Sequence, residues 1–204
     1  MYRIDIYREL TPDQQNQIGC LIYRSWVREA EEHHDVQVIV GKDQTVYDPL
    51  DRSAWHVTAW KDNDTLVGYA RLSLVNPFLI TNEFDEVKLP SFLETSPMTH
   101  TAAYASRLVV DPNQRGQGVG RLLINTRIQL AKELDASVIY GWAVGEKSRS
   151  ALAEAGFTEV LERQGFSTPW YRTKRKTRLV KLDLTSASST LPTHTTGQQA
   201  PRVS

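Results

Sequence analysis

The segment that most restricts the fold is a glycine-rich turn that follows a short apolar run and precedes a helix. The run is Leu108-Val109-Val110, and the turn is Arg115-Gly116-Gln117-Gly118-Val119-Gly120. Glycine adopts positive φ and lets a ligand approach the backbone closely. The first turn of a helix offers unpaired N–H groups and the positive end of the helix dipole. The pattern therefore predicts a strand, a turn and a helix that together bind an anion such as a pyrophosphate.

The spacing of the glycines excludes two better-known phosphate-binding loops. The segment lacks the Gly-x-x-x-x-Gly-Lys-Ser/Thr pattern of nucleoside triphosphatases. The spacing Gly116-x-Gly118-x-Gly120 also differs from the Gly-x-Gly-x-x-Gly of dinucleotide-binding folds. The turn therefore belongs to neither of these classes of nucleotide-binding loop.

Strands and helices alternate along most of the chain, which predicts an α/β fold. A first helix is expected after Thr11, a suitable N-cap before Pro12, and a polar stretch at residues 31–35 interrupts its apolar pattern. Further helices are expected after the glycine-rich turn and over residues 148–155, with Gly156 as a C-cap. The expected strands are residues 3–7, 55–60, 65–75, 101–110, 137–144, 157–161 and 177–184.

The chain divides into one domain and a tail. Residues 1–184 form the expected domain, in which the proline-containing stretch 76–99 is a loop region. Residues 185–204 are rich in Ser, Thr, Pro and Gln and contain no aromatic residue, so we expect this tail to be disordered.

Composition excludes several classes of function. The 204 residues contain 24 Lys plus Arg and 24 Asp plus Glu, and this balance argues against a nucleic-acid binder. The one cysteine, Cys20, allows neither an intramolecular disulfide nor a zinc site of several cysteines. His33, His34 and Asp35 do not complete a metal site, because adjacent side chains point to different faces. With no apolar run of about 20 residues and no secretory signal, we expect a cytoplasmic monomer or homodimer without metal or membrane contact.

The pattern Arg115-x-x-Gly118-x-Gly120 after Leu108–Pro112 closely resembles the acyl-coenzyme A signature of the GNAT acyltransferase superfamily. The strand at 137–144, the helix at 148–155 and Gly156-Phe157 also resemble that superfamily, and the resemblance covers about residues 3–184. It implies a mixed, strongly twisted sheet flanked by helices and splayed open after the strand Leu108–Val110.

The resemblance also implies where a coenzyme binds. The pyrophosphate would lie on the loop and the pantetheine arm in the splay, while backbone N–H groups of the strand polarise the thioester carbonyl. The co-substrate would be acetyl-CoA or another acyl-CoA, and a small-molecule or amino-acid amine would attack it directly. The coenzyme-binding residues implied are Leu108, Val109, Val110, Arg115, Gly116, Gln117, Gly118, Val119, Gly120 and Arg121.

A second resemblance is to the acyl-homoserine-lactone synthase branch of the same superfamily. It rests on Tyr47-Asp48-Pro49-Leu50-Asp51, on the Arg71-Leu72 that follows Gly68-Tyr69-Ala70, and on Ser106-Arg107. The chain departs from that branch at Val46 and Tyr104, where the branch has glutamates that help to bind S-adenosylmethionine. The implied acceptor residues are Trp26, Asp48, Asp51, Arg71 and Arg107. The alternatives are a solvated Asp-Pro turn for the two acids and strand-end salt bridges for the two arginines.

An amine must lose a proton before it attacks, and the leaving thiolate needs an acid. Many GNAT members place a tyrosine acid where this chain has Leu152. We expect Tyr104 to be the catalytic candidate, with a packed aromatic as the alternative, and Glu146 to be the second candidate, with a solvated acid as the alternative. His56 and His100 could also act as bases, although each fits a surface or strand histidine.

The resemblance therefore implies an N-acyltransferase. The alternatives are acyl-homoserine-lactone or N-acyl amino acid synthesis with an acyl carrier protein or a long acyl-CoA, and a non-catalytic acyl-CoA-binding domain. The basic cluster Arg172–Arg178 is interpreted as a turn between the last two strands, with a nucleic acid or acyl carrier protein contact as the alternative.

Overall fold

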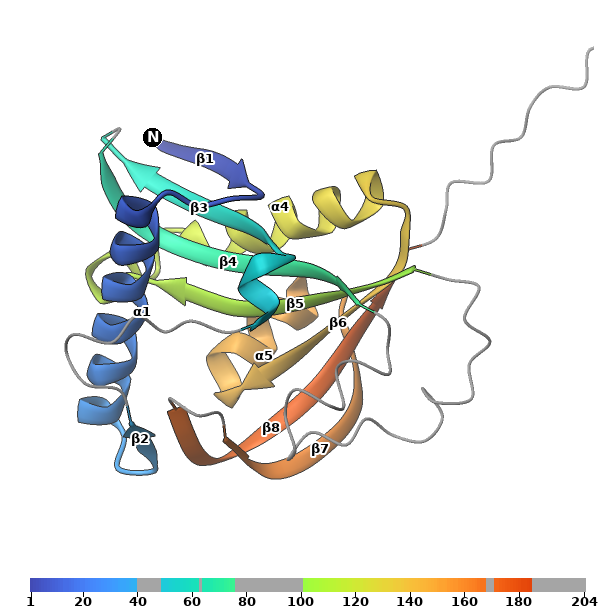
Figure 1. The fold of residues 1–204 in the computed structure, drawn as a ribbon. Coiled ribbons are helices and arrows are strands. Elements are labelled where there is room, and N and C mark those ends of the chain that lie inside the picture. Colours follow the sequence, from blue (N-terminus) through green and yellow to red (C-terminus); the bar gives the residue numbers. More distant parts are fainter. Residues whose placement is uncertain (40–48, 63, 76–100, 168–170, 185–204) are drawn as a thin grey trace, which may run out of the picture.

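A twisted sheet of eight strands organises the part of the chain that the structure describes (Figure 1). The computed structural model describes residues 1–39, 49–62, 64–75, 101–167 and 171–184. Asp48, His100, the expected loop 76–99 and the expected tail 185–204 lie outside these residues. The strands are β1 (Tyr2–Tyr7), β2 (Val36–Val38), β3 (Trp55–Lys61), β4 (Thr65–Val75), β5 (Thr101–Val110), β6 (Ala136–Val144), β7 (Thr158–Ser167) and β8 (Tyr171–Asp183).

Helices cover both faces of this sheet. They are α1 (Pro12–Glu32), α4 (Val119–Glu133) and α5 (Gly145–Glu154), with the short 3-10 helices η1 (Pro49–Arg52) and η2 (Pro112–Gln114). None of the helices in the described ranges is both long and apolar enough to cross a membrane. The order of elements confirms the expected α/β class with a mixed sheet.

The strand order is β1-β3-β4-β5-β6-β8-β2, and β7 pairs with β8. Strands β5 and β6 are parallel, whereas the other pairs are antiparallel. The connection from β5 to β6 is made by the glycine-rich turn and α4, as the sequence predicts. The turn therefore lies at the end of the only parallel pair in the described sheet.

The core is split between the two faces of the sheet, because neighbouring strand residues point in opposite directions. Tyr69 of β4 packs with Leu21 and Ile22 of α1. The next residue, Ala70, belongs to the larger cluster that contains Leu123 of α4. Helices α1 and α4 therefore cover opposite faces, and β4 and β5 lie between them (Figure 1).

The start of α1 forms as predicted, and its end falls within the polar stretch 31–35. The Thr11 side chain accepts a hydrogen bond from the Gln14 N–H, and the Gln14 side chain bonds back to the Thr11 N–H, which makes a capping box. The helix ends at Glu32, with His33 as its C-cap. It leads into β2, an unexpected strand that pairs with the start of β8. As a result, α1 and β2 connect the two halves of the sheet.

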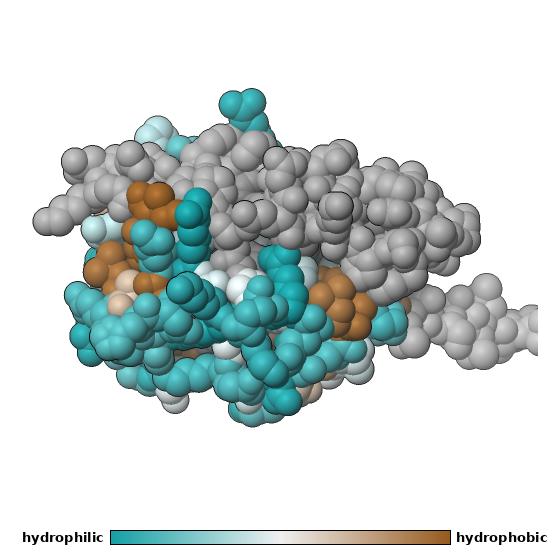
Figure 2. Space-filling view, turned by 90° about the horizontal axis from the view of Figure 1, so that it is seen from below, coloured by the Kyte–Doolittle hydropathy of each residue, from teal (hydrophilic) through white to brown (hydrophobic). Residues whose placement is uncertain are grey.

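The last two strands are longer than expected, and one interpretation is wrong. The basic cluster Arg172–Arg178 lies within β8 and not in a turn. Exposed Arg172 and Lys174 alternate with buried Tyr171 and Thr173, which is the period of a strand with one solvated face. Figure 2 views the molecule from the side on which β7 and β8 lie, and most of the coloured surface there is hydrophilic.

Strands β5 and β6 separate within the sheet. Their pairing ends at Ala105 and Gly141, although β5 continues along β4 as far as Val110. One extra residue of β5 is accommodated near Arg107, which has a φ of 51°. This is a β-bulge, and it turns the strand away from its partner. The opening therefore begins at Ser106, before the run Leu108–Val110 and not after it.

Gly68 allows α4 to approach β4 closely. A Cβ atom at this position would lie 2.8 Å from Val119 Cγ1 and 2.9 Å from Leu123 Cδ1. We expect Gly68→Ala to lower the free energy of unfolding by about 1–3 kcal/mol through overpacking, as measured by urea denaturation. Gly120→Ala is the matched control, because its Cβ would lie 3.7 Å from Val110 and the helix would gain up to about 1 kcal/mol. Equal losses in both variants would contradict this packing.

Candidate functional site

A cavity of about 670 Å³ occupies the opening between β5 and β6. It extends from the glycine-rich turn to the point where the strands separate, and α1, α4 and α5 contribute to its walls. Of the expected coenzyme-binding residues, Gln117 and Arg121 do not line it. Those that do are Leu108, Val109, Val110, Arg115, Gly116, Gly118, Val119 and Gly120.

The turn has the conformation that its glycines predict. Gly116 and Gly118 have φ values of 78° and 84°, and an added Cβ would meet nothing within 4 Å at either position. The glycines are therefore required because of their positive φ, and not because a Cβ atom would clash with a neighbouring residue. Gly118 is the N-cap of α4 and offers no side-chain hydrogen bond, so no side chain caps the first backbone N–H groups of α4. Such an end is suited to a phosphate group.

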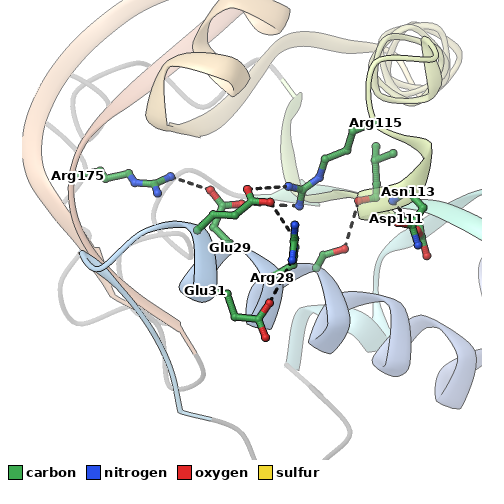
Figure 3. Close-up of polar contacts among 10 residues, drawn as sticks. Arg28, Glu29, Glu31, Asp111, Asn113, Arg115 and Arg175 are labelled. Carbon is green, nitrogen blue, oxygen red and sulfur yellow. Dashed lines mark hydrogen bonds and ion pairs between the residues drawn. The ribbon is translucent and has the colours of Figure 1, made fainter.

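Arg115 lies at the mouth of the cavity, beside two acids of α1. Its guanidinium is 3.8 Å from Glu29 and 3.9 Å from Glu32. Figure 3 shows Arg175 of β8 approaching Glu29 from the opposite side, and that pair is 2.7 Å apart. Arg175 also contacts Asp35 at 3.1 Å. The end of α1 therefore joins the turn to β8 across the opening.

A polar cluster brings together three of the expected acceptor residues. Arg71 donates to Asp51 Oδ1 at 2.7 Å and to Ser106 Oγ at 2.9 Å. Arg107 lies 3.8 Å from Asp51 Oδ2. The alternative interpretation, that these arginines form salt bridges, matches the distances. Arg71 and Arg107 also line the cavity, whereas Asp51 lines a neighbouring cavity of about 350 Å³.

His56 lies behind this cluster and is fully engaged by its neighbours. Its Nε2 is 3.0 Å from the Asp51 carbonyl oxygen, and its Nδ1 is 2.9 Å from the Tyr69 hydroxyl. A carbonyl oxygen can only accept, so Nε2 carries the proton and Nδ1 accepts from Tyr69. Burial lowers the pKa of His56 below its usual 6.5. His56 is therefore a neutral structural histidine and not a base open to the cavity.

The two expected catalytic residues lie in different surroundings. Tyr104 is buried beside Tyr140, one residue before the last β5–β6 pair, and it also lines the cavity. Glu146 is 69% exposed, pairs with Arg178 at 3.0 Å and does not line the cavity. Leu152, at the usual tyrosine position, lines the cavity as a buried apolar residue.

The remaining candidates contribute one aromatic wall and no cluster of metal ligands. The Trp26 ring lies 5.5 Å from the Tyr171 ring, and both line the cavity. Cys20 is exposed on α1. Within the described ranges, no group of three or more His, Cys, Asp or Glu side chains could hold a metal ion.

Arg127 is a cavity residue that the sequence reasoning missed. It is 3% exposed on the inner face of α4 and lines the cavity. A signal was present, because Arg127 follows the core residue Leu123 by four positions and precedes Leu130 by three. A charged residue at this spacing occupies a position where the helix would normally carry an apolar side chain.

The buried pair of Asp51 and Arg71 generates a stability prediction. We expect Asp51→Asn to lower the free energy of unfolding by about 3 kcal/mol, because it leaves the Arg71 guanidinium buried without its carboxylate. Glu31→Gln is the control, since the Glu31–Arg28 pair is exposed and we expect a change of at most about 0.5 kcal/mol. Urea denaturation of both variants makes the comparison, and similar changes would contradict the buried pair.

His56 generates a pH prediction. Its pKa is lower in the folded protein than in the unfolded chain, so the unfolded chain binds more protons as the pH falls below 6.5. We expect the free energy of unfolding to decrease as the pH falls from 6.5 toward 5. The decrease should be smaller in His56→Gln, which removes this group. Urea denaturation at several pH values measures these slopes, and an unchanged slope in His56→Gln would contradict the assignment.

Comparisons with known proteins agree with this geometry. The S18-alanine N-acetyltransferase of Escherichia coli is 13% identical, with a TM-score of 0.58 over 94% of this chain and 99% of that chain. A mosquito arylalkylamine N-acetyltransferase like 5b is 16% identical, with a TM-score of 0.60 over 89% and 100%. A Bacillus subtilis acetyltransferase in complex with CoA is 16% identical, with a TM-score of 0.54 over 90% and 99%.

These identities show a shared fold and nothing more specific. No curated protein matches the chain in sequence. A family model described as the acetyltransferase (GNAT) family matches residues 10–157, which is most of the chain. The chain therefore belongs to the GNAT acetyltransferase family.

Proposed function

We propose that the protein is an N-acyltransferase that transfers an acyl group from acyl-CoA to the amine of a small molecule or an amino acid. The observation that carries this proposal is one continuous cavity, which runs from the glycine-rich turn to the opening between β5 and β6. Residues 1–184 form the proposed catalytic domain. The family uses acetyl-CoA or other acyl-CoA donors, and the B. subtilis neighbour was solved with CoA.

The donor would bind along the α4 side of the cavity. Its pyrophosphate would accept hydrogen bonds from the first backbone N–H groups of α4 and form an ion pair with Arg115. The pantetheine arm would follow the edge of β5 that β6 leaves unpaired after Ala105. The thioester carbonyl would then meet the backbone N–H groups of Leu108–Val110, which stabilise negative charge on its oxygen.

The acceptor would enter from the α1 side. Trp26, Arg71 and Arg107 line this part of the cavity. The neutral amine nitrogen bonds to the thioester carbon, and the carbon–sulfur bond breaks as the tetrahedral intermediate collapses. Tyr104 would donate its hydroxyl proton to the departing thiolate, and the proton released by the amine would pass through water and reprotonate Tyr104.

The polar cluster favours a second candidate function. Asp51, Arg71 and Arg107 lie together in one cluster, and they are residues that the resemblance to acyl-homoserine-lactone synthases implies for the acceptor. An aminoacyl acceptor such as S-adenosylmethionine would carry a carboxylate for one of these arginines. A thermal shift with S-adenosylmethionine in addition to acyl-CoA would favour this second function over the first.

The experiment that tests the function is release of the CoA thiol from acetyl-CoA in the presence of a panel of primary amines.

Gly118→Asp places a negative charge at the uncapped start of α4, and we expect it to raise the dissociation constant for CoA at least about tenfold, or 1.4 kcal/mol. Gly118→Asn is the matched control, because it has the same size and the same strain at a φ of 84°.

CoA binding and thiol release together distinguish an acyltransferase from a domain that only binds acyl-CoA. Calorimetric binding of CoA that falls in Gly118→Asp but not in Gly118→Asn supports the placement of the pyrophosphate. Equal binding by both variants would contradict it. CoA binding without thiol release for any amine would instead support a non-catalytic acyl-CoA-binding domain.

A further inference from the structure

Arg127 is a buried cation for which the described residues supply no counter-ion. Its Nη1 donates to the Ser106 carbonyl oxygen at 3.3 Å, and its Nε has no partner. No carboxylate of the described residues lies within 4.0 Å of the guanidinium. Burial alone lowers the pKa of Arg127 to about 10, with no nearby acid to offset it. The residue stays protonated at neutral pH.

The other buried arginines in the described part of the chain are paired. Arg71 contacts Asp51 at 2.7 Å, and Arg178 contacts Glu146 at 3.0 Å. A charge that leaves water is stabilised only by an opposite charge and hydrogen bonds around it. Arg127 has neither in full, and it lines the cavity. Its missing partner is therefore expected among the ligands of the cavity.

The position of Arg127 indicates which part of a ligand it meets. This inference rests on the proposed function, in which the thioester lies at Leu108–Val110. Ser106, whose carbonyl Arg127 contacts, precedes Leu108 by two residues, with the bulge residue Arg107 between them. It is also the first β5 residue beyond the last pair with β6. Arg127 therefore lies past the thioester, at the closed end of the cavity, where the tail of the acyl group would point.

We propose that Arg127 binds a carboxylate at the far end of the acyl group, so that the donor is the CoA thioester of a short dicarboxylic acid. Because Ser106 and Leu108 are only two residues apart along β5, the acyl group would be short, with about four carbons. Nη1 contacts Ser106 and Nε is buried without a partner, so the edge formed by Nε and Nη2 is the one that would donate two parallel N–H···O bonds to the carboxylate. A neutral acyl tail of the same length would leave the cation unpaired.

The test compares the binding of CoA, succinyl-CoA and butyryl-CoA by calorimetry. Succinyl and butyryl groups have the same number of carbons and differ in the terminal charge. We expect wild-type protein to bind succinyl-CoA about 10- to 100-fold more tightly than butyryl-CoA. Arg127→Met should abolish or reverse this preference and leave the affinity for CoA within about twofold.

Two further variants separate a ligand role from a structural one. Arg127→Lys keeps the charge without the two-pronged geometry, so it should retain part of the preference for succinyl-CoA. Lys132→Met removes one exposed charge from the same helix and should keep the full preference. Ligand-free Arg127→Met should melt no lower than wild type, because an unpaired buried charge has been replaced by an apolar side chain.

Each result has a distinct meaning. If CoA itself fails to bind, the proposed function is wrong. If CoA binds and wild-type protein does not prefer succinyl-CoA to butyryl-CoA, the carboxylate proposal is overturned. The proposal is also overturned if Arg127→Met melts lower without ligand and binds all three ligands equally weakly, because that result assigns Arg127 to support of the β5 bulge.

Discussion

The incomplete pairing of β5 is the constraint on which the cavity depends. This strand is bonded to β4 up to Val110 but to β6 only up to Ala105. The bulge at Arg107 requires a left-handed conformation at a residue other than glycine, which costs about 1 kcal/mol or more. The surrounding side chains stabilise it from both faces of the sheet. Asp51 lies beside Arg107 on one face, and Arg127 reaches the Ser106 carbonyl oxygen on the other.

The opening in the sheet remains bordered by well-packed structure on both sides. Helix α4 packs under β4, where Gly68 permits close contact with Val119 and Leu123. On the other face, α1 packs on Tyr69 and continues through β2 to the start of β8. The cavity therefore has a frame in which strand pairing joins the two halves of the sheet as far as Ala105, and α1 with β2 joins them where β5 and β6 no longer pair.

Much of this arrangement could be predicted from the sequence, because local signals carry it. The capping residues Thr11 and Gln14 and the glycines of the turn act through their own backbone neighbourhoods. The start of β8 was missed because the charges of Arg172 and Lys174 hid a period of two. The bulge at Arg107 has no local signal, since only long-range contacts select a positive φ at an arginine. Glu146 was an expected site residue, but ion pairs hold it outside the cavity.

The ion pairs of Glu29 have a consequence for how the cavity responds to its surroundings. Glu29 contacts Arg115 on one side of the mouth and Arg175 on the other, and its side chain is 29% exposed. At 0.1 M, dissolved salt screens exposed charges that lie more than about 10 Å apart, whereas partly buried pairs in direct contact are screened much less. The ion pairs of Glu29 are of this second kind, because each of their side chains is at most 32% exposed. Moderate ionic strength should therefore leave the entrance close to the width that these pairs set.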